Sequence, residues 1–183
     1  MTTDVPTAVS PPLELKRITT EMHDLEDRMQ LTGELTSGEP VVLWMTQRLV
    51  KRLVPHLLTW LQPAAPTGKS AVVADYHTAA VQSFAQQAAL AQLPEQSAVQ
   101  ATPQHSAWLI ETIDVTRTEE IIALTFKSGE QQATLLMAPQ PLRQWLAILH
   151  DQCVKGEWAL EIWPEWILDS IPTGGPKLNA TMH

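Results

Sequence analysis

The sequence predicts an α+β fold made of two related β-β-β-α units that pack as a pseudo-dimer. Apolar residues first alternate with polar ones at the period of a strand, and then recur at the period of a helix. This change of period occurs twice. The Ser37-Gly38-Glu39 turn reappears as Ser128-Gly129-Glu130, 91 positions later, and an internal duplication explains the repeat. The units would either pair their strands into one curved sheet or stack their helices across two sheets.

The first unit is expected to cover residues 13–62. Leu13 to Met22 supplies a candidate leading strand. Residues 29–36 alternate cleanly and end at Ser37-Gly38, where glycine accepts the positive φ of a tight hairpin turn. Val41 to Met45 is the return strand.

A helix follows from Thr46, whose hydroxyl is a suitable N-cap. Pro55 lies inside this helix and cannot donate a hydrogen bond to the carbonyl of Lys51, so we expect a kink or a break there. The apolar stripe recurs at helical spacing and consists of Leu49, Val50, Leu53, Val54, Leu57, Leu58 and Leu61.

The second unit, residues 105–171, repeats this plan. Trp108 to Val115 is its candidate leading strand, and a hairpin turns at Ser128-Gly129. Pro141 then opens a helix, since proline is tolerated in the first turn. Trp158 to Ile162 alternates and is expected to be a last strand followed by a docking segment. The stripe of the second helix is Leu142, Trp145, Leu146, Leu149 and Cys153.

Residues 63–104, rich in Ala, Gln and Pro, have the composition of a linker. A helix within residues 73–93 is expected to place Tyr76, Val81, Phe84 and Ala88 near one face. The two ends, 1–12 and 172–183, are expected to be flexible.

The composition is that of a folded, acidic protein, with 44% hydrophobic residues, 17% charged residues and a formal net charge of −8. A single cysteine excludes an intramolecular disulfide and favours a reducing compartment. No secretory signal or membrane-spanning run is evident, so we expect a cytoplasmic protein without membrane association.

No motif predicts a catalytic, cofactor or metal site. The six histidines are dispersed and form no zinc-binding pattern. The acidic segment 23–27 is interpreted as a solvated loop, and Cys153 as a buried apolar side chain.

Two groups of residues are candidates for binding. Three tryptophans near the C-terminus, Trp158, Trp163 and Trp166, suit either a core or a partner-binding surface. The polar side of the first helix carries Arg48, Lys51, Arg52 and His56, which suits either a solvated helix face or contact with an anion or nucleic acid.

The sequence therefore favours a non-enzymatic accessory protein that binds another protein through a sheet face, a strand edge or the tryptophan-rich segment. A binder of single-stranded nucleic acid is the first alternative, with Trp44 or Trp108 stacking on bases. The strands-then-helix plan resembles, in architecture alone, the Whirly and PUR-repeat folds that bind such strands. An enzyme with an unrecognised site and a homo-oligomeric state both stay open.

Overall fold

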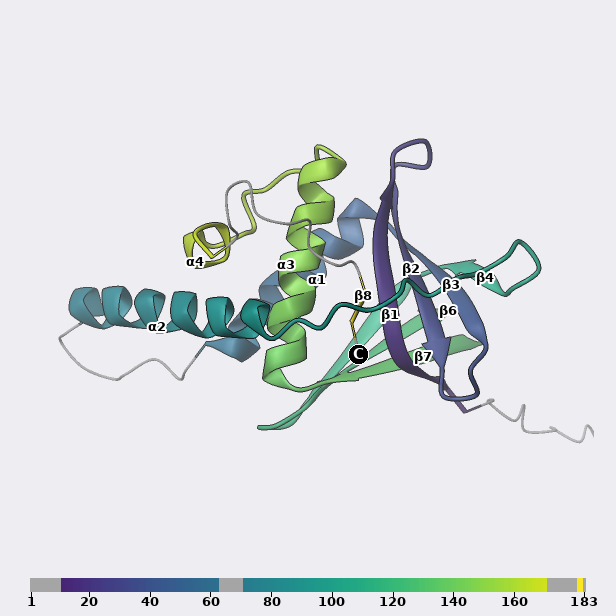
Figure 1. Cartoon of the computed structure of the whole chain (residues 1–183), viewed down its shortest axis with the longest axis horizontal. Coiled ribbons are helices and arrows are strands. Elements are labelled where there is room, and N and C mark those ends of the chain that lie inside the picture. The colour runs from purple at the N-terminus through teal and green to yellow at the C-terminus, as the bar shows by residue number, and fades with distance from the viewer. Residues whose placement is uncertain (1–10, 63–70, 171–180, 183) are drawn as a thin grey trace, which may run out of the picture.

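A curled mixed sheet with helices packed around it makes up the part of the chain that the computed structural model describes, residues 11–62, 71–170 and 181–182 (Figure 1). This agrees with the predicted α+β class. The strands are β1 (Leu13–His23), β2 (Arg28–Leu35), β3 (Pro40–Met45), β4 (Ala107–Leu109), β5 (Thr112–Arg117), β6 (Ile122–Ser128), β7 (Gln131–Met137) and β8 (Thr181–Met182). The helices are α1 (Gln47–Leu61), α2 (Ala71–Ala91), α3 (Pro139–Lys155) and α4 (Glu165–Leu168).

All strands belong to one sheet, in the order β4-β3-β2-β1-β7-β6-β5, with β8 added beside β1. Neighbours are antiparallel within β1-β2-β3 and within β5-β6-β7. The two sets are joined by parallel pairing of β1 with β7 and of β3 with β4. The described strands therefore form one curved sheet.

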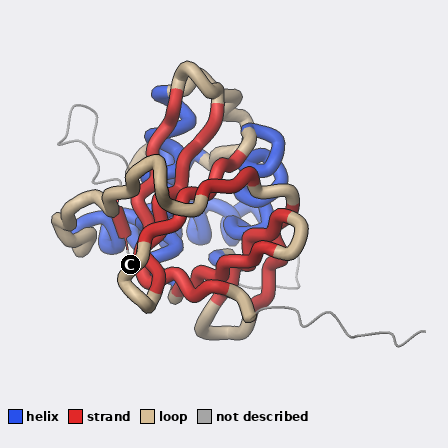
Figure 2. Tube along the Cα trace, turned by 90° about the vertical axis from the view of Figure 1, so that its right-hand side faces the viewer, coloured by secondary structure: helices blue, strands red, loops and turns tan. Residues whose placement is uncertain are grey.

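The sheet curls because the β4–β5 segment changes partner. Ile110 donates its N–H to the Trp44 carbonyl of β3 at 2.9 Å, and the next residue, Glu111, donates to the Lys127 carbonyl of β6 at 2.8 Å. The chain thus passes from one end of the strand order to the other, and the strands wrap around the core (Figure 2).

Helix α1 forms where the sequence predicts it, and its apolar stripe is buried. The Thr46 hydroxyl accepts a hydrogen bond from the Leu49 N–H at 3.4 Å. The break that we considered at Pro55 does not occur, since α1 is continuous from Gln47 to Leu61. Pro55 lies on the exposed side, and its carbonyl accepts a hydrogen bond from the Thr59 hydroxyl at 2.8 Å.

Helix α3 begins at Pro139, two residues before the predicted start, and its predicted stripe is buried. Trp145 is fully buried and donates its indole N–H to the Thr20 hydroxyl of β1 at 3.1 Å. Polar side chains on its other side are buried too, because α2 and α4 pack near α3: Arg143, Gln144, His150 and Gln152.

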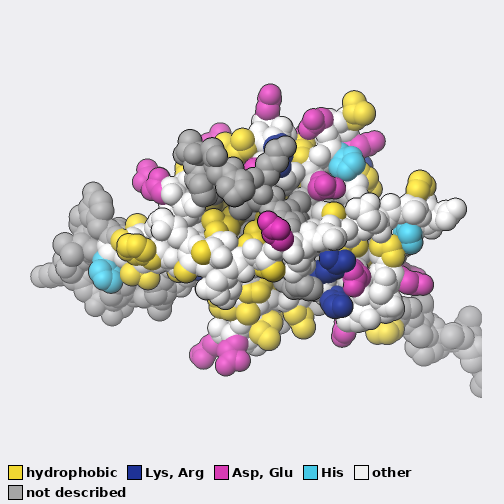
Figure 3. All heavy atoms as spheres, in the orientation of Figure 1, with side chains coloured by type: hydrophobic (Ala, Val, Ile, Leu, Met, Phe, Trp, Pro, Cys, Tyr) yellow, Lys and Arg dark blue, Asp and Glu magenta, His cyan; other side chains and the backbone are white. Residues whose placement is uncertain are grey.

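Helix α2 lies within the segment that has the composition of a linker, and it packs against α3 through polar groups. Gln86 donates to the Arg143 carbonyl at 2.8 Å, and Gln144 donates to the Ala89 carbonyl at 2.8 Å. The expected apolar face points the other way: Val81 is 47% exposed and Phe84 is 72% exposed. Hydrophobic atoms consequently lie on the outer surface of α2 (Figure 3).

The strand expected from Trp158 to Ile162 is not formed, and these residues make an irregular segment that ends in a turn before α4. Glu157 has a φ of 52°, and the Trp158 N–H bonds to the Cys153 carbonyl at 2.9 Å, which turns the chain back over the end of α3. The Trp158 indole N–H donates to the Asp27 carboxylate at 2.7 Å. Tertiary contacts therefore override the local alternation.

Within the C-terminal stretch that we expected to be flexible, Thr181 and Met182 form β8, which pairs antiparallel with β1. Both residues are buried, and the Thr181 hydroxyl lies 2.7 Å from that of Thr19. Among the described residues, no helix combines the length and apolarity needed to cross a lipid bilayer.

Candidate functional site

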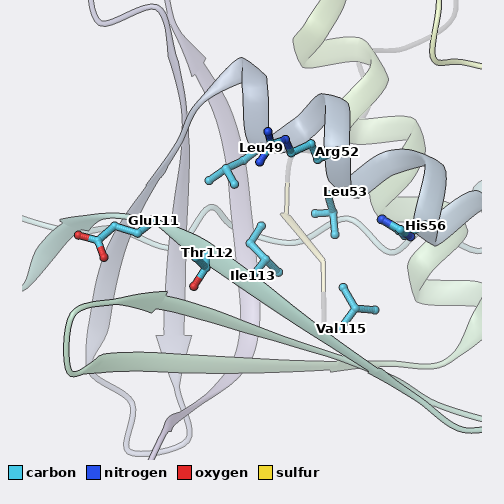
Figure 4. A pocket seen from close by; sticks show the side chains of 8 residues that line it. All are labelled: Leu49, Arg52, Leu53, His56, Glu111, Thr112, Ile113 and Val115. Carbon is cyan, nitrogen blue, oxygen red and sulfur yellow. The ribbon is translucent and has the colours of Figure 1, made fainter.

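A groove of about 250 Å³ runs between helix α1 and strand β5 (Figure 4). In the close view, Leu53 points from α1 toward β5, while Ile113 and Val115 point back toward α1. Its lining consists of Leu49, Arg52, Leu53 and His56 from α1, and Glu111, Thr112, Ile113 and Val115 from the β5 side.

The floor of this groove is apolar because the inner stripe of α1 meets the inner face of β5. Leu49 and Leu53 are buried, and Ile113 and Val115 are half-buried against the core. The alternating β5 residues Thr112, Asp114 and Thr116 are exposed. The groove thus offers apolar contact beside a polar, accessible strand.

The outer edge of β5 carries backbone groups that no neighbouring strand uses. Within the described part of the chain, β5 pairs with β6 and with no second strand. Thr118 donates to the Ile121 carbonyl next to the hairpin turn, and bonded pairs alternate along an antiparallel ladder. Thr112, Asp114 and Thr116 therefore bond to β6, whereas the N–H and C=O groups of 113, 115 and 117 point outward.

The free edge is closed at both ends. Before β5, the continuous β4 segment pairs with β3. After it, the Trp60 indole N–H of α1 donates to the Thr118 carbonyl at 3.0 Å. A length of about five residues is left between these points, which matches a short strand.

Arg52 and His56 line the groove on the α1 side, and the other two residues of the predicted basic group, Arg48 and Lys51, lie on the exposed side of the same helix. All of them are exposed, and none takes part in an ion pair with the residues that the structure describes. The helical repeat that buries the leucines of α1 sets these residues on the outer side.

The acidic groups on the β5 side are already engaged. Asp114 forms an ion pair with Lys127 of β6. The Glu111 carboxylate accepts a hydrogen bond from the Gly129 N–H at 3.2 Å, at the neighbouring hairpin. The cations of α1 therefore lack ion-pair partners among the described residues, whereas these two carboxylates have partners.

The tryptophan-rich segment lies in the core. Trp158, Trp163 and Trp166 are 5%, 5% and 7% exposed. Trp163 meets the His150 ring edge-on with centroids 5.3 Å apart, and Trp166 lies under the Arg143 guanidinium at 5.5 Å. These rings hold the α4 segment against α3 and are not accessible to a partner in this structure.

Cys153 and His150 are buried in settings that do not favour their reactive forms. Burial raises the pKa of the Cys153 thiol to about 12, so the thiolate is disfavoured. Burial lowers the pKa of His150, and Asp151 opposes this effect more weakly. In the described ranges, no group of three His, Cys, Asp or Glu side chains is arranged to hold a metal ion.

Sequence reasoning found the cations of the groove but missed the β5 edge beside them. The sequence predicts a leading strand over Trp108 to Val115, but it does not identify the outer side of β5 as an edge without a second strand among the described residues. Its exposed face of Thr112, Asp114 and Thr116 has the polar composition of an edge strand, and this was the available signal.

Comparison with known protein families, with curated proteins and with solved structures finds no match to this chain. The groove and the edge of β5 are the features of the described chain that suit a binding site.

Proposed function

We propose that this protein is a non-enzymatic interaction protein that binds an extended segment of another protein along the outer edge of β5. The observation that carries the proposal is the juxtaposition of outward-pointing backbone groups at Ile113, Val115 and Arg117 with the α1 groove. Addition of a strand to such an edge satisfies its hydrogen bonds, and adjacent pockets select the side chains.

Of the three surfaces considered from the sequence, the strand edge has the best support. The tryptophans are buried, so binding through them would require the α4 segment to open. An exposed unpaired edge is usually blunted by charge, by a bulge or by a covering segment because it invites pairing. Here the edge is accessible and borders a groove with an apolar floor.

The pseudo-dimer belongs to the same proposal. We regard β1-β2-β3-α1 and β4/β5-β6-β7-α3 as related copies, and the reciprocal parallel pairing of β1 with β7 and of β4 with β3 supports this relation. The single cysteine supports a cytoplasmic setting for the interaction.

Selection from a random peptide library displayed on phage tests the proposal. Peptides enriched on the wild-type protein should lose binding to Val115→Pro, since proline removes an outward N–H that the β6 ladder does not use. A selection that enriches no peptide, or peptides that bind both proteins equally, would refute the assignment of the edge.

A matched control is available one residue away. Thr116→Pro removes an N–H that bonds to β6, so this variant should lose thermal stability, whereas Val115→Pro should retain most of it. Circular dichroism melts of both variants check that lost binding is not lost folding.

Binding of single-stranded nucleic acid is the second candidate, and the exposed cations of α1 are the observation that favours it. Trp108 is buried and Trp44 is half-buried with its ring 5.1 Å from that of His23. The support from stacking is accordingly weaker than the support for a peptide strand.

A further inference from the structure

Strand β1 occupies the same place in the first half of the sheet that the β4–β5 segment occupies in the second. The N-terminal part of β1 pairs parallel with β7, through Leu13–Leu15. Correspondingly, β4 pairs parallel with β3. The register of β1 then shifts between Leu15 and Arg17, and the β4–β5 segment changes partner at Ile110 and Glu111.

Beyond this point the outer edge of β1 is covered, whereas the outer edge of β5 has no second strand among the residues that the structure describes. β8 adds antiparallel to β1, where Ile18 pairs with Met182 and Thr19 pairs with Thr181. With the two hairpin turns aligned at their offset of 91, the partners Gly33 and Thr32 correspond to Leu124 and Ala123, so the positions on β5 equivalent to Ile18 and Thr19 are Val115 and Thr116. Ile18 is buried and Val115 is half-buried, so both point an apolar side chain to the core.

At the far end of each of the two edges, a side chain of a helix forms a hydrogen bond with the backbone. Gln152 of α3 accepts the Met22 N–H of β1 at 2.8 Å. Trp60 of α1 donates to the Thr118 carbonyl just after β5 at 3.0 Å. Each helix therefore bonds to the end of the edge beside it, and the two edges differ in the strand between.

We infer that the outer edge of β5 receives an acidic, extended segment of a partner protein, added antiparallel as β8 is added to β1. This inference depends on the proposed function and names the chemistry of the partner. The segment would alternate apolar side chains, which meet Leu53 and Val115 in the groove, with carboxylates that reach the cations of α1.

The charges of the groove select an acidic partner over a basic one. Arg48 and Arg52 are exposed without ion pairs among the described residues, while Asp114 and Glu111 are engaged with Lys127 and Gly129. The protein carries a formal net charge of −8, so attraction of an acidic segment must come from this local field. Ionic strength should accordingly weaken the binding.

The test uses three fluorescent peptides, each about ten residues long, that alternate valine with glutamate, glutamine or lysine. Fluorescence anisotropy should give an affinity for the glutamate peptide about tenfold or more above that for the lysine peptide. The Arg48→Glu/Arg52→Glu variant should abolish or reverse this preference. Both positions are exposed, so the fold should be retained.

Two further measurements establish where the peptide binds. Methylation of alternate amide nitrogens in the glutamate peptide should abolish binding, since it blocks strand pairing without changing the protein. Amide hydrogen exchange at Ile113 and Val115 should slow when the unmodified peptide binds.

Other outcomes separate this inference from the proposed function. Equal affinity for all three peptides, with protection of Ile113 and Val115, would overturn the acidic preference and leave binding at the edge intact. Absence of binding here and in the library selection would overturn both. A dimer of the free protein that Val115→Pro dissociates, measured by sedimentation, would assign the edge to a second copy of this chain and overturn the inference.

Discussion

The hydroxyl oxygens of Thr19 and Thr181 lie 2.7 Å apart although the residues are separated by 162 positions. The Thr19 hydroxyl also accepts the Val99 N–H at 2.8 Å. The Thr19 side chain of β1 therefore forms hydrogen bonds with both β8 and the segment that follows α2. Through these contacts the two segments cover the edge of β1.

Replacement of Thr19 by valine should destabilise the protein by about 1–3 kcal/mol, because the buried Val99 N–H loses its acceptor. Urea denaturation followed by circular dichroism measures the change. Thr116→Val, at an exposed position of β5, is the matched control and should stay within about 0.5 kcal/mol of wild type. An equal effect of both substitutions would contradict the role of Thr19.

Leu53→Asp should lower the free energy of unfolding by about 3 kcal/mol or more, since it places an unpaired carboxylate in the core beside the groove. Lys51→Asp changes charge on the exposed side of the same helix and should cost far less. Thermal melts of the two variants provide the comparison. An unchanged melting temperature for Leu53→Asp would mean that the α1 stripe is exposed in solution.

Cys153 should resist thiol reagents in the native protein. The side chain is buried and its pKa is raised to about 12, so almost no thiolate is present near pH 8. Reaction with Ellman's reagent should be slow in buffer and complete in guanidinium chloride. Fast stoichiometric labelling of the native protein would be inconsistent with this placement.

The stability of the protein should fall as the solution is acidified through the titration range of His150. Burial lowers the pKa of His150 in the folded state below its ordinary value of 6.5, so protonation favours the unfolded chain. The contribution of the neutral ring is present above pH 6.5 and is lost as the pH falls from 6.5 toward the folded-state pKa.

His150→Phe removes this titration and should flatten the dependence of unfolding free energy on pH below 6.5. Urea denaturation at a series of pH values measures the slopes. Identical slopes for His150→Phe and wild type would assign the acid sensitivity to other groups.

Single-stranded oligonucleotides should not bind with useful affinity at physiological salt. The net charge of −8 opposes the phosphate backbone, and the basic group on α1 is small. Fluorescence anisotropy across a salt series, with an Arg48→Ala/Arg52→Ala variant beside wild type, gives the measurement. Micromolar or tighter binding that the double variant loses would make nucleic-acid binding the primary function.

Local patterns of apolar and polar residues predicted the strands and helices that bury one face in the core. Alternation around Gly38 and Gly129 located the hairpins, and both glycines have the expected positive φ, 89° and 55°. The Thr46 cap and the leucine stripe of α1 were predicted for the same reason. These features depend on residues close together in the chain, so their signal is visible in one short window.

Short stretches of sequence could not predict the contacts of α2 and of the tryptophan-rich segment. The α2 face that packs on α3 includes Gln86, which donates to the Arg143 carbonyl, whereas Phe84 on the apolar side is exposed. The apolar spacing alone does not indicate which face of α2 is buried. Trp158 looked like part of a strand, but Asp27 from a distant turn accepts its indole N–H.

The sequence by itself determined an α+β chain with two hairpins, each followed by an amphipathic helix, and a row of cations on the outer side of α1. Tertiary structure alone decided which strand edge stays open. β8 covers β1 through pairing between residues more than 160 positions apart, whereas β5 receives no second strand from the described chain. Strand pairing depends on which distant segments come together in the fold. The hydrophobic period and the composition of a segment do not indicate which distant segment will be its partner.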